Sequence, residues 1–302
     1  MTLAPAPFGR VLTAMVTPFT DDGSIDLEAA ARVAEHLVAN GNTGVVVSGT
    51  TGESPTTTTE EDGRLLRAVI EAVGDRATVV AGVGTNNTAH SIELAVQAEK
   101  VGAHGTLLVT PYYNKPTQEG LVAHFEAVAD AAGLPVMLYD IPGRTGLTIA
   151  EDTYRRVARH ERIVAVKDAV GDLQRGVRIM ADTGLAFYSG DDVLNLGWLT
   201  HGGCGVVSVV AHVAGTQYAG MVAAVERGDL AEALDIYRGL LPVVDVIMNR
   251  AQGAMTAKAA LQAMGVLANR AVRLPLVPAA DELAAEIRSV LDAAGLLDPH
   301  RK

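Results

Sequence analysis

Short apolar stretches recur along the chain, with amphipathic, alanine-rich segments between them. Eight such stretches begin roughly 20 to 34 residues apart, about the length of one β-strand plus a crossover helix. They are rich in Val and Leu, as expected of strands that are buried on both faces. We predict parallel strands over residues 11–17, 44–48, 78–82, 106–110, 135–139, 163–167, 185–189 and 205–208.

The segments between these strands follow helical periodicity, which is clearest in residues 27–40, 88–101, 119–132 and 191–200. Eight β/α units in succession favour a closed parallel barrel over an open sheet. The strand pattern stops near residue 226, and segments 229–246, 256–264 and 280–294 are typical of helices. We therefore predict an α/β fold: a (β/α)8 TIM barrel over residues 1–226, then a C-terminal helical region over residues 227–302. That region either packs against the barrel or forms subunit contacts.

Composition narrows the class of protein. The 302-residue chain is 49% hydrophobic and 20% charged, which is sufficient for a sizeable core. Its formal charge of -11, without a basic run interleaved with aromatic residues, argues against a nucleic-acid partner. No apolar stretch is long enough to cross a bilayer. Cys204 is the single cysteine, so no internal disulfide is possible. No signal-peptide pattern opens the sequence, and we expect a cytoplasmic protein without membrane partners.

Lys167 is the strongest candidate for chemistry. It ends the apolar stretch 163–167, and barrel enzymes build their sites at the carboxyl ends of the strands. A partly desolvated amine there has a lowered pKa, and its neutral form can attack a ketone and form a Schiff base. Strand alternation places Ile163, Ala165 and Lys167 on one face and Val164 and Val166 on the other. The alternative is an ordinary surface lysine just beyond a strand.

Other polar residues fall at the same rim. Tyr139 ends the fifth predicted strand and shares a face with Met137, so its phenol can point inward beside Lys167 and shuttle protons. The loop after the second strand, residues 49–54, offers hydroxyl and N–H groups to a carboxylate, and we call it the hydroxyl loop. Arg144 can present a bidentate fork to a second carboxylate. The plain alternatives are a core tyrosine, a common glycine-rich turn and a solvated loop arginine.

The remaining motifs do not indicate a cofactor. Gly82-Val83-Gly84 lacks the third glycine of a dinucleotide fingerprint, and no Gly-Lys pair exists for a P-loop. The eight histidines lack metal-ligand spacing. Asp191-Asp192 is interpreted as a pair at a helix N-terminus. We therefore expect neither a metal nor an organic cofactor.

Taken together, the rim motifs resemble the 4-hydroxy-tetrahydrodipicolinate synthases, also called dihydrodipicolinate synthases, in the pyruvate-dependent class I aldolase and lyase superfamily. The likeness runs from about Phe8 into the C-terminal helices. It rests on Gly49-Thr50-Thr51-Gly52-Glu53-Ser54, Tyr112-Tyr113-Asn114-Lys115-Pro116, Tyr139-Asp140-Ile141-Pro142-Gly143-Arg144-Thr145-Gly146 and Val166-Lys167-Asp168. The resemblance implies a cofactor-free carbon–oxygen lyase. Such an enzyme condenses pyruvate with L-aspartate 4-semialdehyde on the diaminopimelate route to lysine.

The resemblance also implies the catalytic residues. Lys167 matches the Schiff-base lysine, and Tyr139 matches the tyrosine that transfers protons at the imine. Thr50 and Tyr113 match the rest of a hydroxyl relay to solvent. In this family the tyrosine matched by Tyr113 reaches into the neighbouring subunit's site. A homotetramer, built as a dimer of dimers, is therefore implied.

Four further positions match substrate-binding residues. Thr51 matches a residue that holds the pyruvate carboxylate, and Arg144 matches the arginine that binds the carboxylate of the aldehyde substrate. Gly190 and Val207 match positions whose backbone lies close to the reaction centre.

One departure from the family pattern concerns regulation. Members that lysine inhibits carry two histidines and a glutamate in a cleft at the subunit interface. The matching residues here are Thr59, Asp62 and His90, which we call the regulatory trio. Without that glutamate the site loses the anion that would pair with the ammonium of lysine. We expect weak or absent inhibition by lysine.

Two other functions remain open from sequence. An N-acetylneuraminate or 2-keto-3-deoxy-sugar-acid aldolase would use the same lysine with a different aldehyde, although such lyases generally lack a counterpart of Arg144. A non-catalytic barrel that binds keto acids would not need Tyr139 and Lys167 together.

Overall fold

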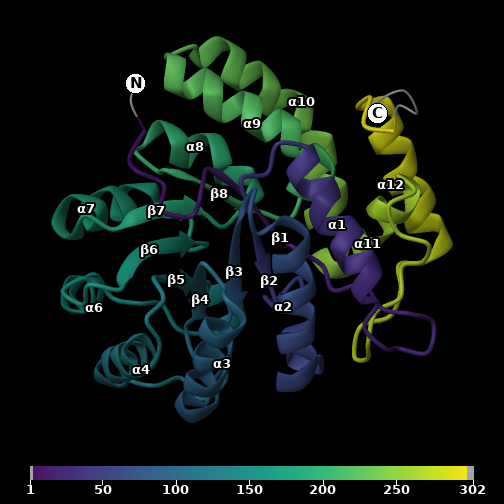
Figure 1. The fold of residues 1–302 in the computed structure, drawn as a ribbon. Coiled ribbons are helices and arrows are strands. Elements are labelled where there is room, and N and C mark those ends of the chain that lie inside the picture. Colours follow the sequence, from purple (N-terminus) through teal and green to yellow (C-terminus); the bar gives the residue numbers. More distant parts are fainter. Residues whose placement is uncertain (1–2, 298–302) are drawn as a thin grey trace.

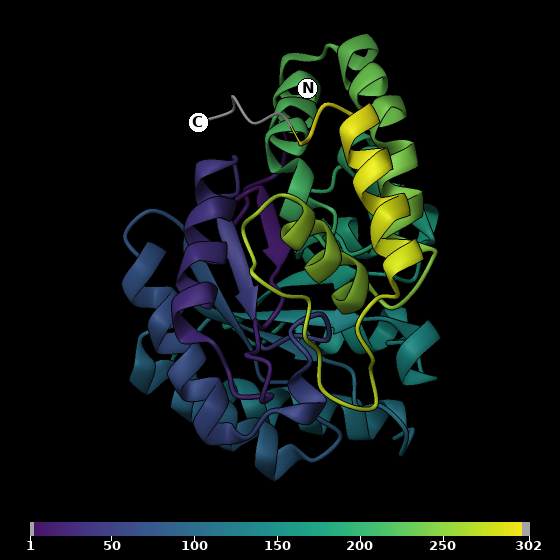
Figure 2. The same cartoon turned by 90° about the vertical axis from the view of Figure 1, so that its right-hand side faces the viewer.

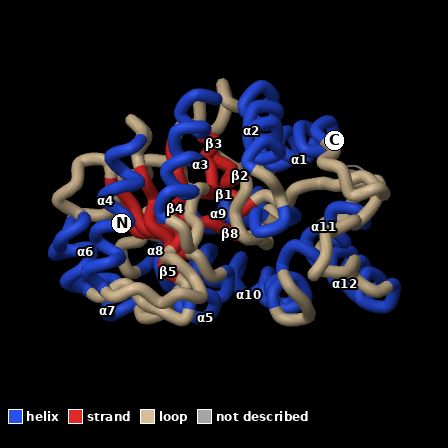
Figure 3. Tube along the Cα trace, turned by 90° about the horizontal axis from the view of Figure 1, so that it is seen from below, coloured by secondary structure: helices blue, strands red, loops and turns tan. Residues whose placement is uncertain are grey.

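A computed structural model describes residues 3–297 and contains a closed barrel of eight parallel strands, surrounded by helices (Figures 1 and 3). Each strand pairs with the next one in sequence, and the last strand closes the barrel against the first. The predicted TIM barrel with C-terminal helices is confirmed. The strands are β1 (Val11–Ala14), β2 (Gly44–Val47), β3 (Thr78–Gly82), β4 (Gly105–Val109), β5 (Val136–Asp140), β6 (Ile163–Asp168), β7 (Ala186–Ser189) and β8 (Gly205–Ser208).

Local signals explain where the surrounding helices begin. Side chains of Asp26, Asn87, Thr117 and Asp172 each cap the helix that follows them, and Thr58 forms a capping box with Glu61. The barrel helices are α1 (Leu27–Ala39), α2 (Thr59–Val73), α3 (Thr88–Val101), α4 (Gln118–Ala131), α5 (Pro142–Thr145), α6 (Glu151–Val157), α7 (Leu173–Thr183), α8 (Asn195–Thr200) and α9 (Ala211–Arg227). Two short 3-10 helices, η1 (Ser54–Thr56) and η2 (Asp192–Leu194), precede α2 and α8.

The first strand is shorter than predicted. Residues 11–17 were expected as one strand, but β1 ends at Ala14. The Met15 N–H still donates to the Val46 carbonyl at 3.0 Å, whereas the Val16 N–H donates to His212 Nε2 at 3.1 Å. A buried histidine ring thus replaces a neighbouring strand as the partner of Val16.

The barrel has an inner and an outer apolar layer, and strand β6 breaks the expected alternation between them. Ala165 lies in the interior cluster, whereas Ile163 packs in the outer cluster together with Val166. Val164 packs against the interior cluster instead. The prediction that Ile163 shares a face with Ala165 and Lys167 is therefore wrong. The register between β5 and β6 shifts at this point, and such an irregularity reverses the faces of the residues before it.

The C-terminal helices pack on one side of the barrel (Figures 1 and 2). They are α10 (Leu230–Met248), α11 (Gly253–Ala263) and α12 (Asp281–Ala293), within two residues of the predicted bounds except at the start of α11. Their apolar faces share one buried cluster with α9 and with Val11 and Val206 of the barrel. The division into units at residue 226 stays a prediction, and residues 1–2 and 298–302 of those two units lie outside the described residues.

The segment between α11 and α12 runs back along the barrel, beside the loop between β1 and α1 (Figure 2). Asn269 Nδ2 donates to Asp21 Oδ1 at 3.0 Å, and Arg273 Nε donates to the Gly23 carbonyl at 2.9 Å. Within residues 3–297, no helix is both long enough and apolar enough to cross a membrane.

Candidate active site

The loops that follow strands β2, β4 and β5 enclose a cavity of about 660 Å³. Its lining includes four of the eight predicted site residues, Thr50, Tyr113, Tyr139 and Arg144. The volume falls within the usual range for a small-molecule site. The fold thus gathers residues that are about 90 positions apart in sequence at one rim, as the barrel topology predicts.

Lys167 lies directly against Tyr139. The two residues are opposite each other in the pairing of β5 with β6, and Lys167 Nζ is 4.2 Å from the centroid of the Tyr139 ring. Lys167 is only 5% exposed and Tyr139 only 6%. Both side chains therefore point into the barrel, and the reading of Lys167 as a solvated surface lysine is wrong.

Burial sets the protonation of both groups. It lowers the pKa of Lys167 to about 8, the negative charge of Asp192 opposes this shift, and the positive charge of Arg144 adds to it. Burial also raises the pKa of Tyr139 well above its usual value, so the phenol stays protonated at neutral pH. A neutral amine is thus accessible beside a neutral proton donor, which is what imine formation requires.

The hydroxyl loop is a compact turn. The Glu53 N–H donates to the Thr50 carbonyl at 3.1 Å, and the Thr17 hydroxyl donates to the Gly52 carbonyl at 2.6 Å. Thr50 lines the cavity, while Thr51 is buried at 8% exposure. The loop therefore presents one hydroxyl to the cavity and encloses the other.

Arg144 and Tyr113 lie at the mouth of the cavity. Arg144 is exposed and belongs to the one-turn helix α5. Tyr113 is 89% exposed and has a φ of +73°, a left-handed conformation that is unusual for a bulky residue. Packing within its own chain therefore does not explain the position of this tyrosine.

Gly190 packs against the lysine, and Val207 lies in the barrel interior. A Cβ atom at Gly190 would lie 2.8 Å from Lys167 Cγ and 2.9 Å from the Asp168 carbonyl oxygen, so only glycine fits. Val207 is buried in the interior cluster that also contains Tyr139. The described lining of the cavity includes Tyr139 but not Lys167, Thr51, Gly190 or Val207. Lys167 instead packs against the Tyr139 ring, which does line the cavity.

Asp192 has a larger role than the sequence indicated. Asp191 caps η2 by accepting from the Val193 N–H, as a helix N-terminal pair should. Asp192 is 2% exposed and accepts from the Val209 N–H at 3.0 Å and from the Tyr218 hydroxyl at 3.0 Å. It therefore ties the turn after β8 to the turn after β7 and places its charge near Lys167.

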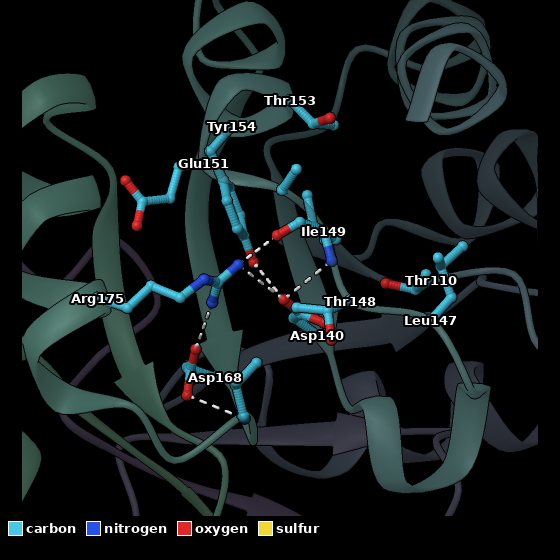
Figure 4. Close-up of polar contacts among 12 residues, drawn as sticks. Thr110, Asp140, Leu147, Thr148, Ile149, Glu151, Thr153, Tyr154, Asp168 and Arg175 are labelled. Carbon is cyan, nitrogen blue, oxygen red and sulfur yellow. Dashed lines mark hydrogen bonds and ion pairs between the residues drawn. The ribbon is translucent and has the colours of Figure 1, made fainter. Parts of the chain in front are cut away.

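A second pair of carboxylates, which the sequence placed at the rim without a role, is buried. Asp140 and Asp168 follow Tyr139 and Lys167 directly, pair with each other across β5 and β6, and are 0% and 1% exposed. Arg175 of α7 lies between them: its Nη2 is 3.6 Å from Asp140 Oδ2, and its Nη1 is 4.0 Å from Asp168 Oδ2 (Figure 4). Burial raises the pKa of both carboxyl groups. A usable signal was present in the sequence, because an acid at a position that should face the helix layer needs a buried partner.

The side chains of the regulatory trio form hydrogen bonds within their own chain. The Thr59 hydroxyl lies 3.2 Å from His90 Nε2, and Asp62 Oδ1 accepts from the Ser48 and Thr57 hydroxyls at 2.8 Å each. Burial raises the pKa of Asp62. The Asp62 carboxylate is thus already engaged by two hydroxyl groups.

A desolvated lysine beside a tyrosine, at the carboxyl rim of a parallel barrel and next to a cavity with an arginine at its mouth, is typical of Schiff-base-forming lyases. A family model described as "Dihydrodipicolinate synthetase family" matches residues 7–294. The chain belongs to this family.

Individual relatives agree over nearly the full length. The 4-hydroxy-tetrahydrodipicolinate synthase of Kineococcus radiotolerans is 61% identical over 290 residues, which cover 96% of this chain and 94% of the relative. The crystal structure of a Cyanidioschyzon merolae dihydrodipicolinate synthase with lysine bound has a TM-score of 0.93 at 42% identity and covers 97% of this chain and 100% of its own. The Acinetobacter baumannii synthase complexed with pyruvate has a TM-score of 0.91 at 35% identity, with coverage of 95% and 99%.

Proposed function

We propose that this chain is a 4-hydroxy-tetrahydrodipicolinate synthase, a lyase that condenses pyruvate with L-aspartate 4-semialdehyde in lysine biosynthesis. The 61% identity to a synthase over 96% of the chain supports the substrates and the product. The observation that carries the chemistry is Lys167 Nζ held 4.2 Å from the Tyr139 ring inside the barrel.

The first half-reaction is imine formation. The neutral amine of Lys167 attacks the ketone carbon of pyruvate, and the resulting carbinolamine loses water to give a protonated imine. The phenol of Tyr139 gives a proton to the departing hydroxyl group and regains one afterwards. Because the imine nitrogen can accept electrons, a methyl proton of the bound pyruvate then leaves and an enamine forms.

The second half-reaction makes the new bond. The enamine carbon attacks the aldehyde carbon of aspartate semialdehyde, whose oxygen takes up a proton. The amine of the same substrate then attacks the imine carbon, closes the ring and displaces Lys167 as a free amine. Thr50 and Tyr113 carry protons between Tyr139 and solvent in both halves.

The carboxylates orient the two substrates. Thr51 and its loop hold the carboxylate of pyruvate, and Arg144 at the cavity mouth binds the carboxylate of the aldehyde substrate with its guanidinium fork. Gly190 and Val207 leave room for the bound pyruvate next to Lys167. The position of Thr50, the neighbour of Thr51, in the cavity lining and the exposed position of Arg144 support this division.

We place Tyr113 in the site of a neighbouring subunit and the enzyme in a dimer of dimers. Support comes from the left-handed backbone of Tyr113 and from its side chain, which is 89% exposed because its own chain leaves it uncovered. Light scattering of the purified protein should give the mass of four chains, and a stable monomer with full activity would contradict the assignment. A cytoplasmic location fits the free, buried thiol of Cys204.

Reductive trapping tests the reaction class. Borohydride should fix pyruvate to the wild-type enzyme on the peptide that contains Lys167, and Lys167→Ala should give no adduct. A pyruvate adduct on that variant would refute the assignment of the nucleophile. A coupled assay with either aspartate semialdehyde or a sugar aldehyde tests the partner, and turnover of only the sugar aldehyde would refute the synthase.

A further inference from the structure

Glu53 holds an unusual position in the hydroxyl loop. Its backbone adopts φ +59° and ψ 32°, a left-handed conformation that residues other than glycine rarely take. Its side chain is only 2% exposed, although a carboxylate is costly to bury without partners. Strain of this kind persists only where the surroundings impose it.

The partners of Glu53 come from the other end of the chain. Lys258 Nζ of α11 donates to Glu53 Oε1 at 2.5 Å and to the Ala271 carbonyl at 2.7 Å. The backbone N–H of Arg273 donates to Glu53 Oε2 at 2.9 Å. Lys258 is 1% exposed, and its ammonium lies 4.2 Å from the centroid of the Phe19 ring. We call Glu53, Lys258 and Arg273 the Glu53 clamp.

The side chain of Arg273 extends the clamp to both flanks of the loop. Its guanidinium donates to the Thr56 carbonyl at 2.8 Å and to Glu61 Oε2 at 2.9 Å, and it also donates to the Gly23 carbonyl. The bond from Arg273 lowers the pKa of Glu61 to about 2, so this carboxylate stays charged. The C-terminal segment is therefore hydrogen-bonded to the chain both before and after the hydroxyl loop.

We propose that the Glu53 clamp positions Thr50 and Thr51 for pyruvate, so that the C-terminal helical region serves catalysis as a positioning element. The link is short, because the Glu53 N–H donates to the Thr50 carbonyl at 3.1 Å. Any shift of the Glu53 carboxylate is thereby passed to the backbone of Thr50. This inference rests on the proposed roles of Thr50 and Thr51.

Stability alone is a poor explanation of the clamp. A buried ion pair is often replaced by apolar side chains with no loss of stability, because desolvation offsets the attraction between the charges. Two charges and a strained backbone, in contact with the loop that bears two site residues, instead specify one loop geometry. A displacement of about 1 Å at such a loop can lower catalysis on the order of 100-fold.

Lys258→Met tests the proposal. Methionine approximates the length of the lysine stem and removes its charge, which leaves one oxygen of Glu53 without this donor. We expect kcat/KM for pyruvate and the second-order rate constant of imine trapping to fall about 10- to 100-fold. These constants are measured well below the melting temperature of the variant. Arg250→Gln is the matched control, because Arg250 forms exposed ion pairs with Glu286 and Asp245 in the same C-terminal region.

The outcomes separate positioning from stability. A lowered melting temperature with wild-type trapping constants would overturn the proposal. Glu53→Gln keeps the shape of the side chain, and the same constants are measured on this variant if Lys258→Met does not fold. In the double variant Lys258→Met/Glu53→Gln, the fall in kcat/KM and in the trapping rate constant should be smaller than the product of the two single falls, because the two residues act as one unit. Failure of the wild-type enzyme to trap pyruvate would instead refute the proposed function.

Discussion

The protonation of Lys167 gives a quantitative prediction. Burial lowers its pKa from 10.5 to about 8. At pH 7 about one-tenth of the amine would then be neutral, against roughly one part in 3,000 for an unperturbed lysine, and this difference is worth about 3 kcal/mol. Desolvation alone should therefore make Lys167 about 300-fold more available for attack than a solvated lysine.

The sign of the pH dependence follows. Only the neutral amine attacks pyruvate, so trapping should become faster as the pH rises and should level off above about 8, the pKa of Lys167. Arg144→Met removes a positive charge that lowers this pKa, so the midpoint should move to higher pH. Imine formation should survive in this variant, because Arg144 is assigned to the second substrate.

The assay is reductive trapping with pyruvate and cyanoborohydride over a pH series, with the adduct counted on the Lys167 peptide. Nα-acetyl-lysine in the same tube serves as the solvated amine. A midpoint for Lys167 that coincides with that of acetyl-lysine would show a hydrated amine and refute the argument from burial. An Arg144→Met midpoint that moves to lower pH would refute the electrostatic part.

Three further predictions concern other parts of the protein. Gly190→Ala places a Cβ 2.8 Å from Lys167 Cγ and should reduce stability by about 1–3 kcal/mol and slow trapping. Gly239→Ala, with open space around its Cβ, should leave trapping unchanged, and equal effects of the two changes would contradict the steric argument. Tyr113→Phe should lower turnover about 10- to 1000-fold by breaking the proton relay, and an unaltered turnover number would remove Tyr113 from the mechanism. We expect lysine to inhibit the enzyme weakly or not at all, because the regulatory trio contains no glutamate to pair with the ammonium of lysine. A titration with strong inhibition at sub-millimolar lysine would contradict this.

The sequence by itself determined the barrel and the rim. Eight apolar stretches at regular spacing predict eight buried parallel strands, and the carboxyl ends of these strands then lie at one rim. For this reason the amino-acid sequence alone was enough to place Lys167, Tyr139, Thr50 and Arg144 together. Strand periodicity is a local property, and it was sufficient wherever the strand was regular.

Only the tertiary structure decided the rest, because the deciding contacts are long-range. The register shift between β5 and β6 places Ile163 in the outer layer. The hydrophobic pattern of β6 alone does not indicate this shift. The partners of Glu53 lie 205 and 220 residues away. The sequence shows that a residue is charged but not that it is buried. Only the folded structure shows which partner compensates for the burial of that charge.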